Sequence, residues 1–200
     1  MNKKIKNKKV KDKKAGEKVD DVRKKVYSKI LDIAKSISRK KKEGALFIIA
    51  NKNNFKDSYR TLYPIVTKKF SVFTKGVEPI IEKLATLDGA VLITNDGFLI
   101  AYGAMIKYSR PMPGFGTKHA AASGFTRKFK DSTAVLVDEN IDWIKIFQNG
   151  KIILELDSEE RPSSIKKKII DFVADHDMTL LTTAGVSAAL FGGRLCLNGF

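Results

Sequence analysis

Apolar residues recur with a helical period along the first fifth of the chain. Between residues 17 and 42 they lie three or four positions apart, at Val19, Val22, Val26, Ile30, Ile33 and Ile37. Lysine and arginine fill much of the remaining surface, which is the pattern of a helix with one apolar face. Such a face must be buried, so we expect a long amphipathic helix over 15–43 that packs on a domain or on a partner subunit. Gly44 is expected to end it.

After Gly44 the apolar pattern alternates between strand and helix periods. Buried or alternating runs predict strands over Ala45–Ala50, 90–93, 98–101, Thr133–Val137, 143–147 and 151–156. Helical spacing predicts helices over 77–87, 119–125 and 163–174. Turn signals at 95–97 and 149–150 indicate two hairpins. The expected fold class is α/β: a single domain with a mixed, twisted central sheet flanked by helices and preceded by the long N-terminal helix.

The same pattern divides the chain into four segments. Residues 1–14 hold eight lysines and few apolar side chains, so a basic disordered tail is expected there. The helix over 15–43 follows, then the α/β domain over 44–160. Residues 161–200 are expected to form a C-terminal helix and an apolar segment, both packed on the domain.

Charge is distributed unevenly between these segments. Residues 1–43 carry 18 basic and 6 acidic side chains, which is +12 of the net +16. The domain itself is therefore almost balanced, and it shows no basic strand face with interleaved aromatics. This argues against a nucleic-acid-binding domain, although the tail is left with three readings: a solubility element, a contact with anionic lipid, or a contact with nucleic acid.

The single cysteine, Cys196, excludes an internal disulfide and a cysteine-based zinc site. No apolar signal segment follows the polar start, and the run over 178–193 is too short and too interrupted to cross a membrane. We therefore expect a cytoplasmic protein with no transmembrane segment.

Three short polar stretches stand where strands or helices begin or end. Asp88 precedes Gly89 and Ala90, two small residues that allow a ligand to approach the backbone, while the carboxylate could bind a metal or orient a hydroxyl. Gly116, Thr117, Lys118 and His119 open a helix; backbone N–H groups, a hydroxyl and an ammonium are typical phosphate ligands. His119 could bind a metal or a phosphate oxygen.

The third stretch, Asp138-Glu139, ends a strand and is either part of a metal site or a polar turn. Each stretch alone also has an ordinary structural explanation. Walker A and Gly-x-Gly-x-x-Gly spacings are absent from the sequence.

In their order and spacing these stretches resemble the diadenylate cyclase domain family. That family carries Asp-Gly-Ala, then about thirty residues later Gly-Thr/Ala-Arg-His-Arg, then a strand ending in Ser-Glu-Glu. The corresponding stretches here are 87–90, 116–122 and 137–139, and the resemblance covers about 44–156. Residues 100–106, with Gly103, Met105 and Ile106, resemble the segment whose backbone recognises adenine.

The resemblance implies that two ATP molecules are condensed into cyclic di-AMP and two pyrophosphates across a face-to-face dimer. It implies catalytic roles for Asp88, Thr117 and His119. It further implies nucleotide binding by Gly89, Ala90, Gly103, Met105, Ile106, Gly116, Thr117 and Lys118, and a site for Mg²⁺ or Mn²⁺ at Asp88, His119 and Glu139.

Two positions depart from the family pattern: Lys118 replaces the first arginine of Arg-His-Arg and Ala120 replaces the second. Lysine keeps the positive charge but cannot form the bidentate hydrogen bonds that arginine makes with phosphate. Alanine removes a charge. The alternative function is a sensor of the same fold that binds cyclic di-AMP or ATP without turnover. Retention of Asp88 beside the Thr117/His119 pair favours the enzyme.

Overall fold

The computed structural model describes residues 2–41, 43–64, 70–139, 143–157, 169–171 and 173. It contains the helices α1 (Asn2–Lys41), α2 (Glu78–Ala85) and α3 (Thr117–Lys128) and the 3₁₀ helix η1 (Lys52–Phe55). The strands are β1 (Ala45–Ala50), β2 (Tyr59–Thr61), β3 (Ala90–Thr94), β4 (Leu99–Ile106), β5 (Thr133–Val137), β6 (Trp143–Gln148) and β7 (Lys151–Asp157). None of the helices in these ranges combines the length and the apolar character needed to span a membrane.

The strands form one mixed sheet in the order β2-β4-β3-β1-β5-β6-β7. β1 and β3 are parallel neighbours at its centre, and the other pairs are antiparallel. β1 and β3 are buried along their whole length, because helices cover both faces of the sheet there. The predicted α/β class with a mixed central sheet is confirmed.

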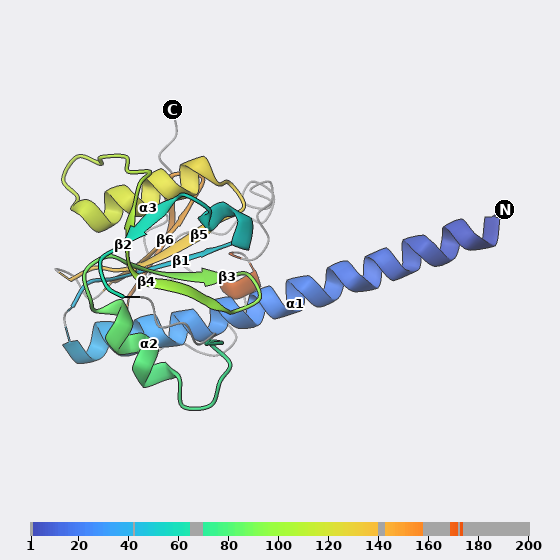
Figure 1. Cartoon of the computed structure of the whole chain (residues 1–200), viewed down its shortest axis with the longest axis horizontal. Coiled ribbons are helices and arrows are strands. Elements are labelled where there is room, and N and C mark those ends of the chain that lie inside the picture. Colours follow the sequence, from blue (N-terminus) through green and yellow to red (C-terminus); the bar gives the residue numbers. More distant parts are fainter. Residues whose placement is uncertain are drawn as a thin grey trace.

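Two apolar cores lie on opposite faces of the sheet. α1 and α2 cover one face, where Ile30, Ile37 and Ile81 pack against strand residues such as Phe47. α3 covers the other face, where Phe125 packs on Phe55 and on residues of β1, β3 and β5. Figure 1 shows this three-layer arrangement, with α3 on one side of the sheet and α1 and α2 on the other. The amphipathic helix therefore buries its apolar face against its own domain.

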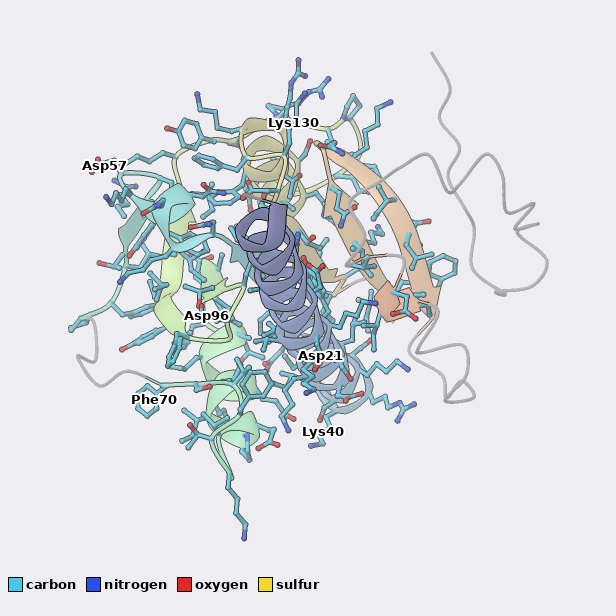
Figure 2. The ribbon with its side chains drawn as sticks, turned by 90° about the vertical axis from the view of Figure 1, so that its right-hand side faces the viewer. Asp21, Lys40, Asp57, Phe70, Asp96 and Lys130 are labelled. Carbon is cyan, nitrogen blue, oxygen red and sulfur yellow. The ribbon has the colours of Figure 1, made fainter. Side chains whose placement is uncertain are left out.

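Helix α1 differs from the prediction at its beginning. It starts at Asn2, so the residues expected to form a disordered tail up to position 14 are helical in their backbone, and the helix extends beyond the domain (Figure 1). Lysine is a good helix former, and no proline interrupts the segment. In Figure 2, which looks along α1, Asp21 and Lys40 mark two points of the part that lies on the domain.

Smaller elements also differ from the prediction. The strand β2 and the 3₁₀ helix η1 lie where only a loop or no element was expected. The predicted C-terminal helix over 163–174 is described at 169–171 and 173, which are helical. The rest of that helix, the apolar run over 178–193, His176 and Cys196 lie outside the described residues.

Candidate functional site

The predicted site residues gather at one end of the sheet. β1 and β3 begin at this end, and β4 and β5, antiparallel to them, finish there, with Ala45 opposite Val137 and Ala90 opposite Ala104. We call this the site end. Asp88 stands two residues before the first residue of β3, so it lies at the same end of the sheet as Gly44, which directly precedes β1.

A pocket of about 110 Å³ opens at the site end between α3 and the end of β5. Its lining includes two of the three polar stretches but not Asp88: Gly44, Gly116, Thr117, Lys118, His119, Leu136, Val137, Asp138 and Glu139. A β-carbon at Gly44 would lie 2.9 Å from Glu139 Oε2 and 3.3 Å from Lys118 Nζ, so both side chains reach across this glycine. The pocket has room for phosphate groups or an ion with its waters, whereas a whole nucleotide needs several hundred Å³.

Helix α3 points its N-terminus at this pocket. Thr117 is the first helical residue, Gly116 caps it in an extended conformation without a side-chain bond, and Thr117 is exposed. The first N–H groups of a helix lack partners within the helix and carry a partial positive charge. This end of α3 therefore offers donors to an anion, as the sequence predicted for phosphate.

Gly124 fixes how closely α3 approaches the loop that leads into it. A β-carbon there would lie 2.3 Å from Tyr108 O and 2.8 Å from Ser109 Cα, and real β-carbons are not found at such distances from backbone.

We predict that Gly124→Ala lowers the free energy of unfolding by about 1–3 kcal/mol, despite the better helix propensity of alanine. Urea unfolding followed by circular dichroism measures this. At Gly116, where no atom would lie within 4 Å of the new β-carbon, the same change should cost less than about 1 kcal/mol. Equal stability of the two variants would contradict the prediction.

Asp88 and Gly89 form a tight approach to β4. Gly89 has φ +93°, and a β-carbon on it would lie 2.6 Å from Gly103 C and 2.7 Å from Ala104 N. Only glycine fits, because the position needs both a left-handed backbone and direct contact with the neighbouring strand. Asp88 Oδ1 accepts a hydrogen bond from Gly89 N–H at 2.8 Å, and the side chain is exposed. The carboxylate is thus held in place while it faces solvent.

Gly103 carries a second close approach, on the β4 segment expected to recognise adenine. It has φ +54°, and its missing β-carbon would lie 2.2 Å from the Tyr63 ring. The Tyr63 and Tyr102 rings are near-parallel, with centroids 6.4 Å apart. Met105 is exposed and Ile106 half-buried on the same segment. Tyr63 has no motif around it that would have predicted its place here.

Behind the pocket lies a buried polar cluster that the sequence did not predict. Lys145 of β6, only 3% exposed, places Nζ 2.6 Å from Asp138 Oδ2 and 3.2 Å from His119 Nε2. His119 Nε2 lies 3.5 Å from the same Asp138 oxygen, and Glu155 of β7 is 4.0 Å from Lys145 Nζ. The sequence offered one signal for it: Lys145 is a charged residue inside the apolar run Trp-Ile-Lys-Ile-Phe, which was predicted to be a strand.

Burial lowers the pKa of His119 below its usual 6.5, and the charge of Lys145 lowers it further, while Asp138 and Glu139 act in the opposite direction. As the pH falls below 6.5, the unfolded chain takes up a proton at this residue before the folded chain does. The free energy of unfolding should therefore fall over that interval. We predict that His119→Gln, which keeps an acceptor, loses less stability than the unmodified chain between about pH 7.5 and about pH 5.5, measured by urea unfolding. An identical loss in both proteins would assign the pH dependence to other groups.

The predicted metal ligands fall into two parts of the site end. His119 and Glu139 line the pocket, whereas Asp88 lies outside its lining, two residues before the start of β3 at the same end of the sheet. Within the described residues, no group of three or more His, Cys, Asp or Glu side chains is arranged to enclose an ion. Mg²⁺ commonly takes one or two protein carboxylates and completes its shell with phosphate oxygens and water. The exposed carboxylates of Asp88 and Glu139 fit that kind of ion, shared with a bound substrate.

A three-layer α/β domain with a helix N-terminus, a lysine and carboxylates at one sheet end is the arrangement of a nucleotide-binding domain. Residues 33–152 match the family described as DisA bacterial checkpoint controller nucleotide-binding, abbreviated DAC. The match covers more than half of the chain, and the protein belongs to this family.

Two curated relatives are named diadenylate cyclase. The one from Methanocaldococcus jannaschii is 26% identical over 150 residues, covering 70% of this chain and 48% of that protein. The one from Haloferax volcanii is 26% identical over 143 residues, covering 67% and 52%. The chain thus spans about half the length of the curated relatives it matches.

One of two similar solved structures shows the same fold. A structure titled as a hypothetical membrane spanning protein from Bacillus cereus aligns with a TM-score of 0.52 and 20% identity, over 63% of this chain and 61% of that one. A double mutant of DacA from Staphylococcus aureus aligns over 82% of this chain and 97% of that one, with 16% identity and a TM-score of 0.47. At these sequence identities the similarity concerns the fold alone. It rests on the Bacillus cereus structure, whose TM-score is 0.52.

Proposed function

We propose that the protein is a diadenylate cyclase, which condenses two ATP molecules into cyclic di-AMP and two pyrophosphates. The observation that carries this proposal is the pocket between the α3 N-terminus and Glu139, at the same end of the sheet at which Asp88 precedes β3. These residues come from three parts of the chain that are far apart in sequence. Family membership and the two relatives named diadenylate cyclase support the same function.

In the proposed reaction each 3′-hydroxyl oxygen bonds to the α-phosphorus of the other nucleotide. Each α-phosphorus releases pyrophosphate, and the proton of each hydroxyl passes to water. Asp88, fixed by Gly89 N–H, orients the hydroxyl and holds the ion; Thr117, Lys118 and the α3 N-terminus bind the phosphates. Such donors stabilise the charge that develops as pyrophosphate leaves, because they are already in place before the reaction.

Mg²⁺ or Mn²⁺ would be held by Asp88 and Glu139 together with nucleotide oxygens, and it would neutralise phosphate charge and favour ionisation of the hydroxyl. His119 could contribute a third ligand, as the family resemblance implies. Its Nε2, however, already faces Lys145 and Asp138, which favours phosphate for the opposite side of the ring.

The proposal requires two copies of the chain. One site holds one ATP, and the attacking hydroxyl comes from the nucleotide of the facing copy, so a single protomer can bind ATP but cannot complete the ring. The site end is the face that the two copies would share. The rate per protomer should therefore rise with protein concentration until the dimer is saturated.

The test is incubation of the purified protein with ATP and either Mn²⁺ or Mg²⁺, followed by mass spectrometry of the products. Cyclic di-AMP whose rate per protomer rises with protein concentration is the expected result. Nucleotide binding without product at any protein concentration would overturn the enzyme and favour the alternative, a sensor of ATP or cyclic di-AMP. Titration calorimetry with each nucleotide provides the binding arm.

A further inference from the structure

Lys145 is a charged residue in a position where charge is costly. It lies in the middle of β6, 3% exposed, between Leu136 of β5 and Glu155 of β7 in the sheet register. A buried lysine needs partners for its charge and its three N–H donors. Asp138 takes one donor at 2.6 Å, and His119 Nε2 lies within hydrogen-bond distance of another at 3.2 Å.

The contact between Lys145 and His119 determines which ring nitrogen carries the proton. An ammonium group donates and cannot accept, so a hydrogen bond with Lys145 requires Nε2 to be the unprotonated acceptor. In a neutral ring the proton then resides on Nδ1. Without Lys145, Nε2 would have Asp138 Oδ2 at 3.5 Å as its partner, which favours a proton on Nε2 instead.

The orientation of the ring is fixed as well as its proton. Phe115 packs on one side of the ring with centroids 4.6 Å apart, and Phe147 meets it edge-on at 6.0 Å. Lys145 Nζ also lies 4.7 Å from the centre of the Phe115 ring. The ring belongs to the pocket lining, and its hydrogen-bond contacts among the described residues are made through Nε2. The other nitrogen is therefore available to a ligand.

We infer that Lys145 is a positioning residue, which holds His119 as the neutral Nδ1–H form so that the ring donates a hydrogen bond to a phosphate oxygen in the pocket. The inference deepens the proposed function and rests on it for the identity of the ligand. It also explains why a lysine is buried at this position, since Lys145 can serve the site without contacting a phosphate itself. Lys145 acts through His119, whereas Lys118 reaches the pocket itself.

The first test needs no activity. The chain has two histidines, so uniformly ¹⁵N-labelled protein gives two sets of ring nitrogen signals, and His176→Gln identifies those of His119. Long-range ¹H–¹⁵N spectra at neutral pH should show a pyridine-type Nε2 and a pyrrole-type Nδ1 for His119. A pyrrole-type Nε2, or two protonated nitrogens, overturns the inference whatever the protein catalyses.

Variants separate positioning from a merely structural contact. Lys145→Met should move the proton of His119 to Nε2, while Lys145→Arg, which still donates, should preserve the Nδ1–H form. Lys151→Met, an exposed lysine of β7, is the matched control and should leave the spectrum unchanged. If Lys145→Met does not fold, the spectrum of the unmodified chain still decides the question.

Kinetics provide the functional arm. If the ring donates to a phosphate in the transition state, Lys145→Met should lower kcat about 10-fold or more with little change in KM, and Lys145→Arg should restore most of the rate. An unchanged kcat alongside a changed tautomer would overturn the positioning role. Absence of product from the unmodified chain would instead count against the proposed function and leave the spectroscopic result standing.

Discussion

Asp88→Asn is expected to lower the rate of cyclic di-AMP formation by a factor of about 10²–10³ while the fold is retained. Asparagine has nearly the shape of aspartate, and its Oδ1 can still accept the hydrogen bond from Gly89 N–H that fixes the side chain. Only the negative charge is lost, and with it the group proposed to orient the hydroxyl and hold the ion. Initial rates at saturating ATP, together with thermal unfolding, measure both parts of the expectation.

The chain offers a matched control for this change. Asp96 is also exposed, and it precedes Gly97, whose φ of +86° is close to the +93° of Gly89. It lies in the turn between β3 and β4, at the opposite end of the sheet from the site (Figure 2 marks its place). Asp96→Asn should leave the rate unchanged. Asp88→Asn activity equal to that of Asp96→Asn would remove Asp88 from the mechanism.

The second large effect concerns stability. Asp138→Ala is expected to lower the free energy of unfolding by about 3–5 kcal/mol, because it leaves the ammonium of Lys145 buried without its closest counter-charge. Glu155, at 4.0 Å, is too distant to replace a contact of 2.6 Å. Urea unfolding gives the value directly.

Two further variants test whether burial of the charge causes the loss of stability in Asp138→Ala. Asp21 pairs with Lys25 at 2.7 Å, nearly the same distance, but both side chains are 64% exposed. Asp21→Ala should therefore cost less than about 1 kcal/mol. Removal of both buried charges, by Asp138→Ala with Lys145→Met, should recover much of the loss, since no uncompensated charge remains. A double variant as unstable as Asp138→Ala would show that the charge is not the cause.

The sequence predicted those elements whose residues alternate with a clear period. The six predicted strands are present, since each shows a buried or alternating apolar run. β2 was missed because three residues are too few to show a period, and its place is set by pairing with β4 alone. The start of α1 was missed because lysine-rich sequence is typical of both disordered tails and helices.

For the site, local sequence was informative about the chemistry of single stretches but not about their contacts. Residue types at strand and helix ends indicated Asp88, Thr117, His119 and Glu139, and the strand order together with the packing of α3 places them at one end of the sheet. The contact between Lys145 and His119 depends on how α3 packs across β6, which no local pattern encodes. Gly44 was expected only to end a helix, and its role beneath Lys118 and Glu139 follows from the packed structure.

The two outer strands have a consequence for how copies of the chain can meet. An unprotected outer strand can pair with another chain and begin aggregation, and short strands or inward-facing charges reduce that risk. β2 has only three residues, and β7 directs Glu155 toward the buried Lys145. Within the described part of the chain, both outer strands thus carry a feature that discourages lateral growth of the sheet. Pairing of these two described strands with a second copy should therefore not drive association of the chain.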